Sequence, residues 1–351
     1  MNGETPMRVL RTALVATALA LSFAEGTAAK PKPEVLLKVA TLAPDGSTWM
    51  NLMRELDARV REATANEVGF RFYAGGVQGD ERLVLRKMRT GQLHGGGFTG
   101  NGLGIVAPSL RVLEIPFLLE TEDEIDAVYE MFGPELEGAL DDAGYVLLGW
   151  AEVGFVHLFT KRPVRNLDDL RNQKMWLWEG DPLPEAFFRE AGVAPVSLAI
   201  TDVYTSLQTG LVDGVYCSPY AAVVLQWHTQ VRAMSAVPIT HAIGAVIVSK
   251  KAYAPVSAAS RQKVREIAAD VFSRLKVSSR QENRDAIEDI RRAGIEVVPI
   301  GADAMRVFRE IGDRASQRGV GQLYSADLLA RIRSAVAEVR PAEAATTVGK
   351  P

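Results

Sequence analysis

Residues 35–73 read VLLKVATLAPDGSTWMNLMRELDARVREATANEVGFRFY, and this stretch indicates the fold class. Its first seven residues are mostly apolar and predict a strand. Residues 45–47 offer side chains that cap a helix, on which Leu52, Leu56 and Val60 recur every four positions. The last four residues predict a second strand. A strand, a helix and a strand in this order are typical of a parallel sheet covered by helices.

The same alternation continues along most of the chain. Further strands are predicted at residues 145–149, 155–159, 174–178, 193–198, 212–216, 244–249 and 295–298. Helical patterns separate most of these strands, which predicts an α/β fold of two lobes, each a mostly parallel sheet flanked by helices. From Ser257 to about Ala293 the pattern is a long, highly charged helical region. No linker is visible, so we expect the chain to cross between the lobes more than once.

The composition is that of an ordinary globular protein. The chain has 351 residues, 47% of them hydrophobic and 24% charged, with a formal net charge of -3. This length suggests about two domains, and the mild negative charge gives no reason to expect nucleic acid as a partner. We expect residues 34–153 plus 242–281 to form lobe I, residues 154–241 plus 282–340 to form lobe II, and residues 341–351 to be a disordered tail.

The N-terminus has the three parts of a secretory signal peptide. Arg8 and Arg11 precede an apolar run at residues 12–24, and small residues follow at 27–29. We therefore expect a signal peptide at residues 1–29, cleaved at or near Ala29, and a soluble protein of the periplasm. An uncleaved anchor is the alternative. The chain has one cysteine, Cys217, so it cannot form an internal disulfide.

No motif for catalysis or for a cofactor stands out. Residues 95–104 form the densest glycine run, but Ile105 stands where a dinucleotide fingerprint needs its third glycine. We expect this run to be a strand-to-helix turn that also lines a site. The four histidines lack the spacing of metal ligands. We therefore expect no enzyme, no metal and no cofactor, although a hydrolase built on Cys217 is left open.

Aromatic residues gather at the ends of the predicted strands. They are Trp49, Trp150, Trp176, Trp178, Tyr216 and Tyr220. Trp176 and Trp178 share one face of their strand, because side chains alternate with a period of two. This repeated placement predicts a pocket lined by aromatic rings.

Several short motifs occur in a characteristic order. They are Gly79-Asp80-Glu81-Arg82, Gly91-Gln92-Leu93, Pro116-Phe117-Leu118, the run 166–171, Asp202-Val203-Tyr204, the run 207–210 and Val212-Asp213-Gly214. With them the chain resembles, from about Leu36 to Arg333, the substrate-binding subunits of tripartite ATP-independent periplasmic (TRAP) transporters, the DctP-like proteins. The resemblance implies two lobes joined by crossing strands and a long helix, with a ligand in the cleft. It also implies a partner, a transporter with a small and a large membrane subunit.

The chain departs from that family at the ligand site. The resemblance implies an arginine that pairs with a ligand carboxylate, but Trp176 stands at its position, and Val156 stands where a second arginine is common. Such a pair is directional and charge-assisted, and a buried carboxylate without one is strongly disfavoured. We therefore predict an apolar pocket. The predicted ligand-binding residues are Trp49, Glu81, Phe98, Thr99, Asn101, Trp150, Phe155, Val156, Trp176, Trp178, Tyr216, Ser218 and Tyr220.

Three functions follow from these observations. The first is capture of a small hydrophobic or largely uncharged ligand for TRAP uptake. The second is a periplasmic carrier of a lipid or hydrophobe that is not coupled to uptake. The third keeps the family's organic acids as ligands and takes the missing cation from Lys161 or Arg162.

Overall fold

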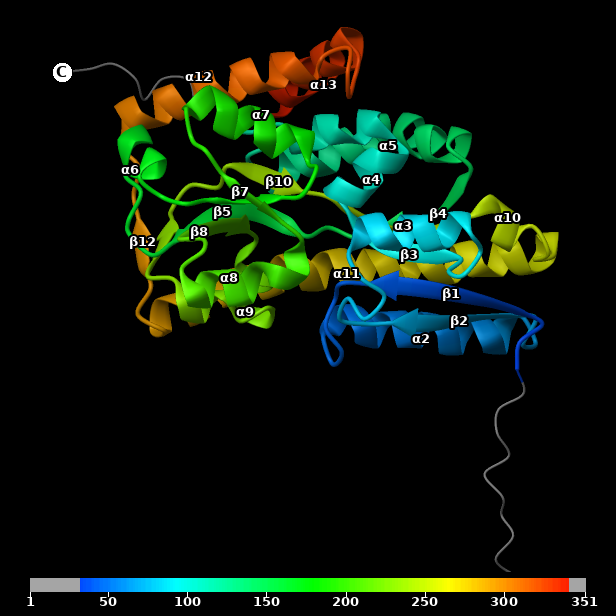
Figure 1. The fold of residues 1–351 in the computed structure, drawn as a ribbon. Helices are drawn as coiled ribbons and strands as arrows, with labels where there is room; N and C mark the ends of the chain where they lie inside the picture. The colour runs from blue at the N-terminus through cyan, green and yellow to red at the C-terminus, as the bar shows by residue number, and fades with distance from the viewer. Residues whose placement is uncertain (1–31, 341–351) are drawn as a thin grey trace, which may run out of the picture.

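The computed structural model describes residues 32–340. The predicted signal peptide (1–29) and the predicted tail (341–351) lie outside these residues. Figure 1 shows two groups of strands, each covered by helices, with one long helix running past both. Within residues 32–340, no helix combines the length and the apolar character needed to cross a bilayer.

The first sheet has five strands in the order β2-β1-β3-β11-β4. Their bounds are β1 Val35–Thr41, β2 Val68–Tyr73, β3 Gly95–Thr99, β4 Tyr145–Trp150 and β11 Gly244–Ser249. β1 pairs in parallel with β2 and β3, whereas β11 runs antiparallel to β3 and β4. Side chains alternate between its two faces, so that Ile247 and Val248 enter different hydrophobic clusters.

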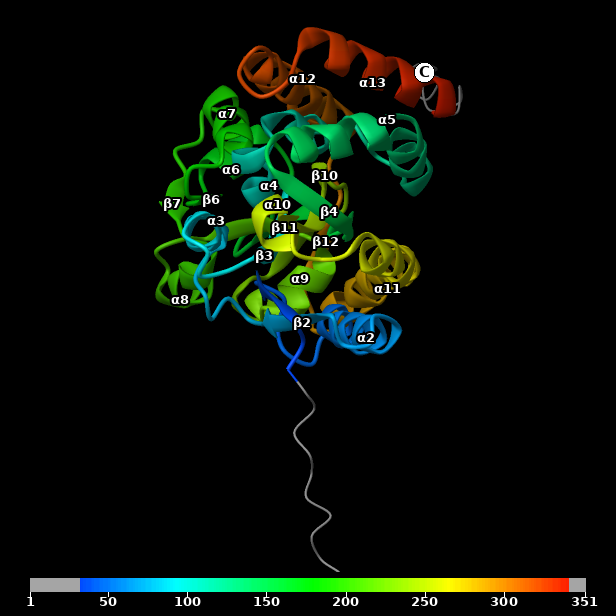
Figure 2. The same cartoon turned by 90° about the vertical axis from the view of Figure 1, so that its right-hand side faces the viewer.

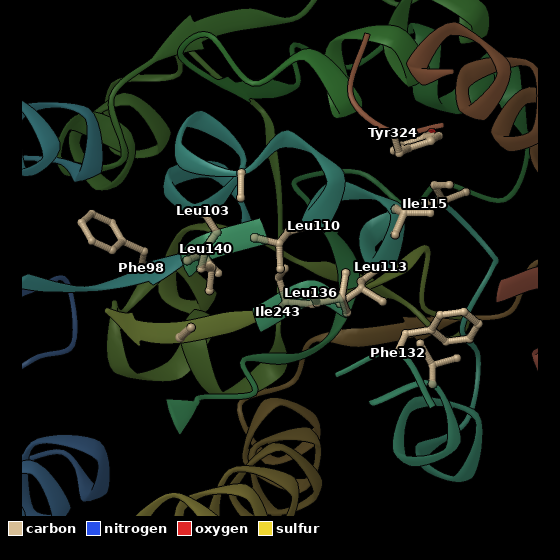
Figure 3. Close-up of a cluster of buried hydrophobic side chains, with 14 of the residues drawn as sticks. Phe98, Leu103, Leu110, Leu113, Ile115, Phe132, Leu136, Leu140, Ile243 and Tyr324 are labelled. Carbon is tan, nitrogen blue, oxygen red and sulfur yellow. The ribbon is translucent and has the colours of Figure 1, made fainter. Parts of the chain in front are cut away.

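Helices cover both faces of the first sheet. Their bounds are α2 Thr48–Ala63, α3 Glu81–Arg89, α4 Gly100–Val106, the 3-10 helix η1 Pro108–Glu114, α5 Glu122–Asp142 and α10 Lys250–Tyr253. The side chain of Ser47 accepts a hydrogen bond from the amide of Met50 and so caps α2. Figure 3 shows the cluster on the opposite face, which joins Leu103 of α4, Leu113 of η1 and Leu136 of α5.

The second sheet has the order β10-β5-β9-β12, and β8 also pairs with β5. Its bounds are β5 Gly154–Thr160, β8 Gly214–Cys217, β9 Ala233–Ser235, β10 Thr240–Ala242 and β12 Glu296–Val298, and a separate pair is β6 Trp176–Trp178 with β7 Val196–Leu198. The associated helices are α6 Leu167–Arg171, α7 Pro182–Ala191, η2 Ile200–Asp202, α8 Val203–Thr209, α9 Pro219–Val224, η3 Trp227–Gln230, α12 Ala302–Gly319 and α13 Ala326–Val339.

The chain passes between the sheets through two short segments and one long helix. Residues 151–153 link β4 to β5, and Ile243 links β10 to β11. The two links bond to each other, since the amide of Ala151 donates to Gly244 O at 2.7 Å and that of Val153 donates to Ala242 O at 3.2 Å. Helix α11, Ala258–Arg292, contacts α2 beside the first sheet and α9 beside the second, as Figure 2 also shows.

The structure confirms the predicted α/β class, the mostly parallel sheets, the crossing strands and the long helix. In each sheet a single strand is reversed, because β11 in the first sheet and β5 in the second run antiparallel to their partners. These two strands each enter their sheet directly from a crossing link. A parallel neighbour would require a crossover helix, which a short link does not provide. The short strands β3, β9 and β10 were not expected from the sequence.

The lobe boundaries stay a prediction. Helix α12 packs on α7 through Phe308 and Phe188, whereas α13 packs on α5 through Ile332 and Leu136. The C-terminal helices therefore contact both parts of the molecule (Figure 1), although residues 282–340 were expected to belong to lobe II alone.

Helix α11 provides a test of this packing. Phe272 is buried and lies so close to Gly149 of β4 that a Cβ at this glycine would overlap the ring. We expect Phe272→Ala to lower the free energy of unfolding by about 3 kcal/mol or more, because it leaves a cavity. Val277 on the same helix is 64% exposed, so Val277→Ala should change it by less than about 0.5 kcal/mol. Urea denaturation measures both, and equal losses would contradict the assigned faces of α11.

Candidate ligand-binding site

A cavity of about 280 Å³ lies between the two sheets. Gly97 of β3 lines it from the first sheet, Trp176 of β6 and Cys217 of β8 line it from the second, and Val153 lines it from a crossing segment. Most strands that reach it do so at their carboxyl ends, which is where α/β sheets commonly bind ligands. A position between two parts of a fold is typical of sites that bind a small ligand.

Most of the predicted ligand-binding residues line this cavity. They are Trp49, Glu81, Phe98, Thr99, Asn101, Val156, Trp176, Trp178, Tyr216, Ser218 and Tyr220. Their contact with a ligand stays a prediction, but the structure brings them to one place.

Trp150 and Phe155 do not line the cavity. The ring of Trp150 packs against Tyr129 of α5 with a centroid distance of 5.2 Å, and Phe155 meets His241 edge-on at 5.5 Å. Alternation along the strands explains both cases, because Val156, next to Phe155, faces the cavity and Phe155 faces away. Both were predicted to bind the ligand, and the structure places them outside this cavity.

One wall of the cavity consists of stacked aromatic rings. Trp176 stacks on Tyr216 with centroids 5.0 Å apart and meets Trp227 edge-on at 5.5 Å. Its indole Nε1 donates to Leu198 O at 3.0 Å, which fixes the ring. The backbone amide of Trp178 donates to the Tyr216 hydroxyl at 3.1 Å. This wall is rigid and apolar, and it stands where the family resemblance implies an arginine.

Trp178 contributes the one polar atom of this wall that lacks a partner. Its indole Nε1 is buried and makes no hydrogen bond within residues 32–340. An unpaired buried N–H is costly, so this atom is a local cost of burying the ring in the wall.

The glycine run shapes the opposite wall. It forms β3 and the start of α4, and a Cβ at Gly102 would lie 2.7 Å from Glu81 Oε2. The amide of Gly102 donates to that oxygen at 2.7 Å, and the Thr99 hydroxyl donates to it at 3.0 Å. The predicted turn is therefore present, and its glycines let a buried carboxylate hold the start of α4. Burial raises the pKa of Glu81 to about 8, despite these hydrogen bonds.

A buried ion cluster at the cavity was not found from the sequence. Arg111 of η1 lies between Glu114, three residues further on, and Asp181, which caps α7. Its Nη2 atom donates to Asp181 Oδ1 at 2.8 Å and to Oδ2 at 3.0 Å. All three residues line the cavity. The only signal in the sequence is an arginine and an acid inside the otherwise apolar run 110–115.

The cations proposed from the sequence lie elsewhere. Lys161 donates from Nζ to Leu207 O at 2.7 Å, and the guanidinium of Arg162 bonds to Asn172 O. Neither residue lines the cavity. The structure therefore places neither of the two predicted cations at the cavity.

The surroundings of Cys217 do not favour a catalytic role for its thiol. This residue lines the cavity as a free cysteine, and burial raises the pKa of its thiol, which keeps it protonated. Within the described residues 32–340, no group of three or more His, Cys, Asp or Glu side chains could hold a metal ion.

Known proteins share this fold. The structure aligns with a TRAP periplasmic solute-binding protein from Xanthobacter autotrophicus with bound β-D-galacturonate, at a TM-score of 0.79 and 18% identity over 85% of this chain and 99% of that one. A solute receptor from Bordetella pertussis that binds pyroglutamic acid aligns at a TM-score of 0.78 and 21% identity over the same shares.

The sequence comparisons agree. A solute-binding protein from Chromohalobacter salexigens is 25% identical over 258 residues, 72% of this chain and 75% of that protein. The C4-dicarboxylate-binding periplasmic protein DctP of Rhodobacter capsulatus is 22% identical over 346 residues, 94% of this chain and 99% of its own length.

The fold and the enclosed cavity thus define a two-lobed solute-binding protein. Residues 39–320 match the model of the DctP family, bacterial extracellular solute-binding protein family 7, and the chain belongs to this family. This confirms the predicted TRAP-type, DctP-like class. It also identifies a periplasmic binding protein rather than an enzyme.

The raised pKa of Glu81 gives the site a testable pH dependence. Its ordinary value is 4.5 and its value in the folded chain is about 8, so between these values the folded chain holds a proton that the unfolded chain has lost. Stability from this group is therefore full below about pH 4.5 and is lost as the pH rises through about 8. We expect the wild type to lose stability relative to Glu81→Gln by up to about 1.4 kcal/mol per pH unit in this window. Urea denaturation from pH 5 to 8 measures the difference, and a constant difference would contradict the assignment.

Proposed function

We propose that this protein captures a small hydrophobic or largely uncharged ligand in the cavity between its lobes, for uptake by a TRAP transporter. Its partners are the small and the large membrane subunits of that transporter. The observation that carries the ligand class is the aromatic wall formed by Trp176, Trp178 and Tyr216.

The wall is chemically unlike the ligands that are bound in the structural neighbours. Their bound ligands include β-D-galacturonate, D-glucuronate and orotic acid, which are all acids. In this chain an indole at position 176 faces the cavity, and Val156 beside it is apolar. Transfer of a carboxylate into such a place is unfavourable without a free cation. Apolar area on a ligand, in contrast, is stabilised by about 25 cal/mol per Å² that it buries.

Fluorescence titration with N-phenyl-1-naphthylamine tests the proposal. This uncharged aromatic probe brightens in apolar surroundings. We expect the protein to bind the probe with a micromolar dissociation constant. Other uncharged hydrophobes should displace the probe, whereas D-galacturonate and succinate should not. Displacement of the probe by micromolar D-galacturonate or succinate, or no binding of the probe, would overturn the proposed ligand class.

Two tryptophans provide a matched pair for the same titration. Both are half-buried, but Trp49 lines the cavity and Trp150 does not. We expect Trp49→Ala to lower the affinity for the probe by about thirtyfold, or about 2 kcal/mol, because it removes an aromatic contact. Trp150→Ala should leave the affinity unchanged. Equal losses in both variants would place the probe outside this cavity.

A further inference from the structure

Arg111 is the one lysine or arginine among the cavity-lining residues of the described chain, and it is not free to bind an anion. Its side chain is 4% exposed, and its two terminal nitrogens face the carboxylates of Glu114 and Asp181. Both oxygens of Asp181 lie within 3.0 Å of Nη2. Asp181 thus occupies an end of the guanidinium that a ligand carboxylate would need.

We propose that Asp181 is an internal counter-ion which takes the place of a ligand carboxylate on Arg111, and that Asp181 and Glu114 together make the cavity selective against anionic ligands. This inference rests on the proposed function and specifies its ligand class further, as uncharged amphiphiles without a carboxylate.

The charges around the cavity agree with this role. With both acids ionised the cluster of Arg111, Glu114 and Asp181 carries one net negative charge, and with either acid protonated it is neutral. It presents no net positive charge in either state. Glu152 and Glu282 also line the cavity, and no further lysine or arginine of the described chain does. Glu81 lines it as well, but its raised pKa of about 8 keeps it uncharged near neutral pH.

Burial disfavours any negative charge in this cavity. It raises the pKa of Glu114 and of Asp181, and the nearby Arg111 opposes this shift. An anion brought into the cavity would lose its hydration and meet acids that already share one guanidinium. An uncharged ligand neither loses ionic hydration nor is repelled by these acids.

The geometry allows the charge of Asp181 to be removed with little other change. Asp181 Oδ1 also accepts from the amide of Leu183 at 3.2 Å and so caps α7, a role that asparagine fills equally well. The loop before it is held separately, because Arg82 Nη2 donates to the carbonyls of Glu179 and Gly180 at 3.3 Å. For Glu114, Oε1 accepts from the amide of Ile243 at 2.9 Å, and the carbonyl of a glutamine can do the same.

The test compares two probes of one shape that differ in charge, 4-phenylbutanoate and 4-phenyl-1-butanol, as competitors of N-phenyl-1-naphthylamine. We expect the wild type to prefer the alcohol. In Asp181→Asn the affinity for the anion relative to the alcohol should rise at least tenfold, and in Asp181→Asn with Glu114→Gln it should rise further. Glu179→Gln removes a charge from an exposed position in the same loop and should leave the ratio unchanged.

The ratio of the two affinities separates selectivity from a general loss of structure, which would weaken both competitors. An unchanged ratio in Asp181→Asn and in the single variant Glu114→Gln would overturn the inference while leaving the proposed function intact. Equal binding of both competitors by the wild type would do the same. Failure of the wild type to bind N-phenyl-1-naphthylamine would overturn the proposed function and, with it, the inference.

Discussion

The buried guanidinium of Arg111 is the constraint on which the arrangement of residues around the cavity depends. A charge with so little exposure must be compensated, and one of its two partners, Asp181, belongs to the segment that follows the second lobe's β6. Keeping this pair intact holds η1 near the start of α7 and so fixes the width of the cavity between them. Removing both partners would leave an uncompensated buried charge, which is far more costly than losing an exposed ion pair.

The walls of the cavity around this pair are packed in different ways. The glycine run lets Glu81 approach the backbone closely and hold the start of α4. The opposite wall stacks Trp176 on Tyr216 and leaves little room for rearrangement. Glu152, in the segment that links β4 to β5, pairs with Arg280 of α11 at 3.0 Å and so anchors the long helix to this link. The result is a largely apolar cavity between the two sheets.

The alternation of apolar runs and helical patterns was enough to predict the fold class, because local periodicity reports which face of each element is buried. It could not predict the reversal of β11 and β5, since these two strands return across the links rather than through helices. The positions of the predicted strand ends were enough to find most of the residues that line the cavity. The face of the sheet on which Phe155 lies could not be predicted, because it depends on the register of its strand. Arg111 was missed because its partner Asp181 is seventy positions away, and no local pattern reports such a contact.

The most direct test of this account is the identity of the molecule that the protein carries in its native periplasm. The protein purified from its own host without refolding, and analysed by native mass spectrometry followed by extraction, should release an apolar compound that bears no carboxylate. A stoichiometric amount of a sugar acid or a dicarboxylate in the same preparation would contradict the account, because the cavity would then accept the charge that Asp181 and Glu114 are inferred to exclude.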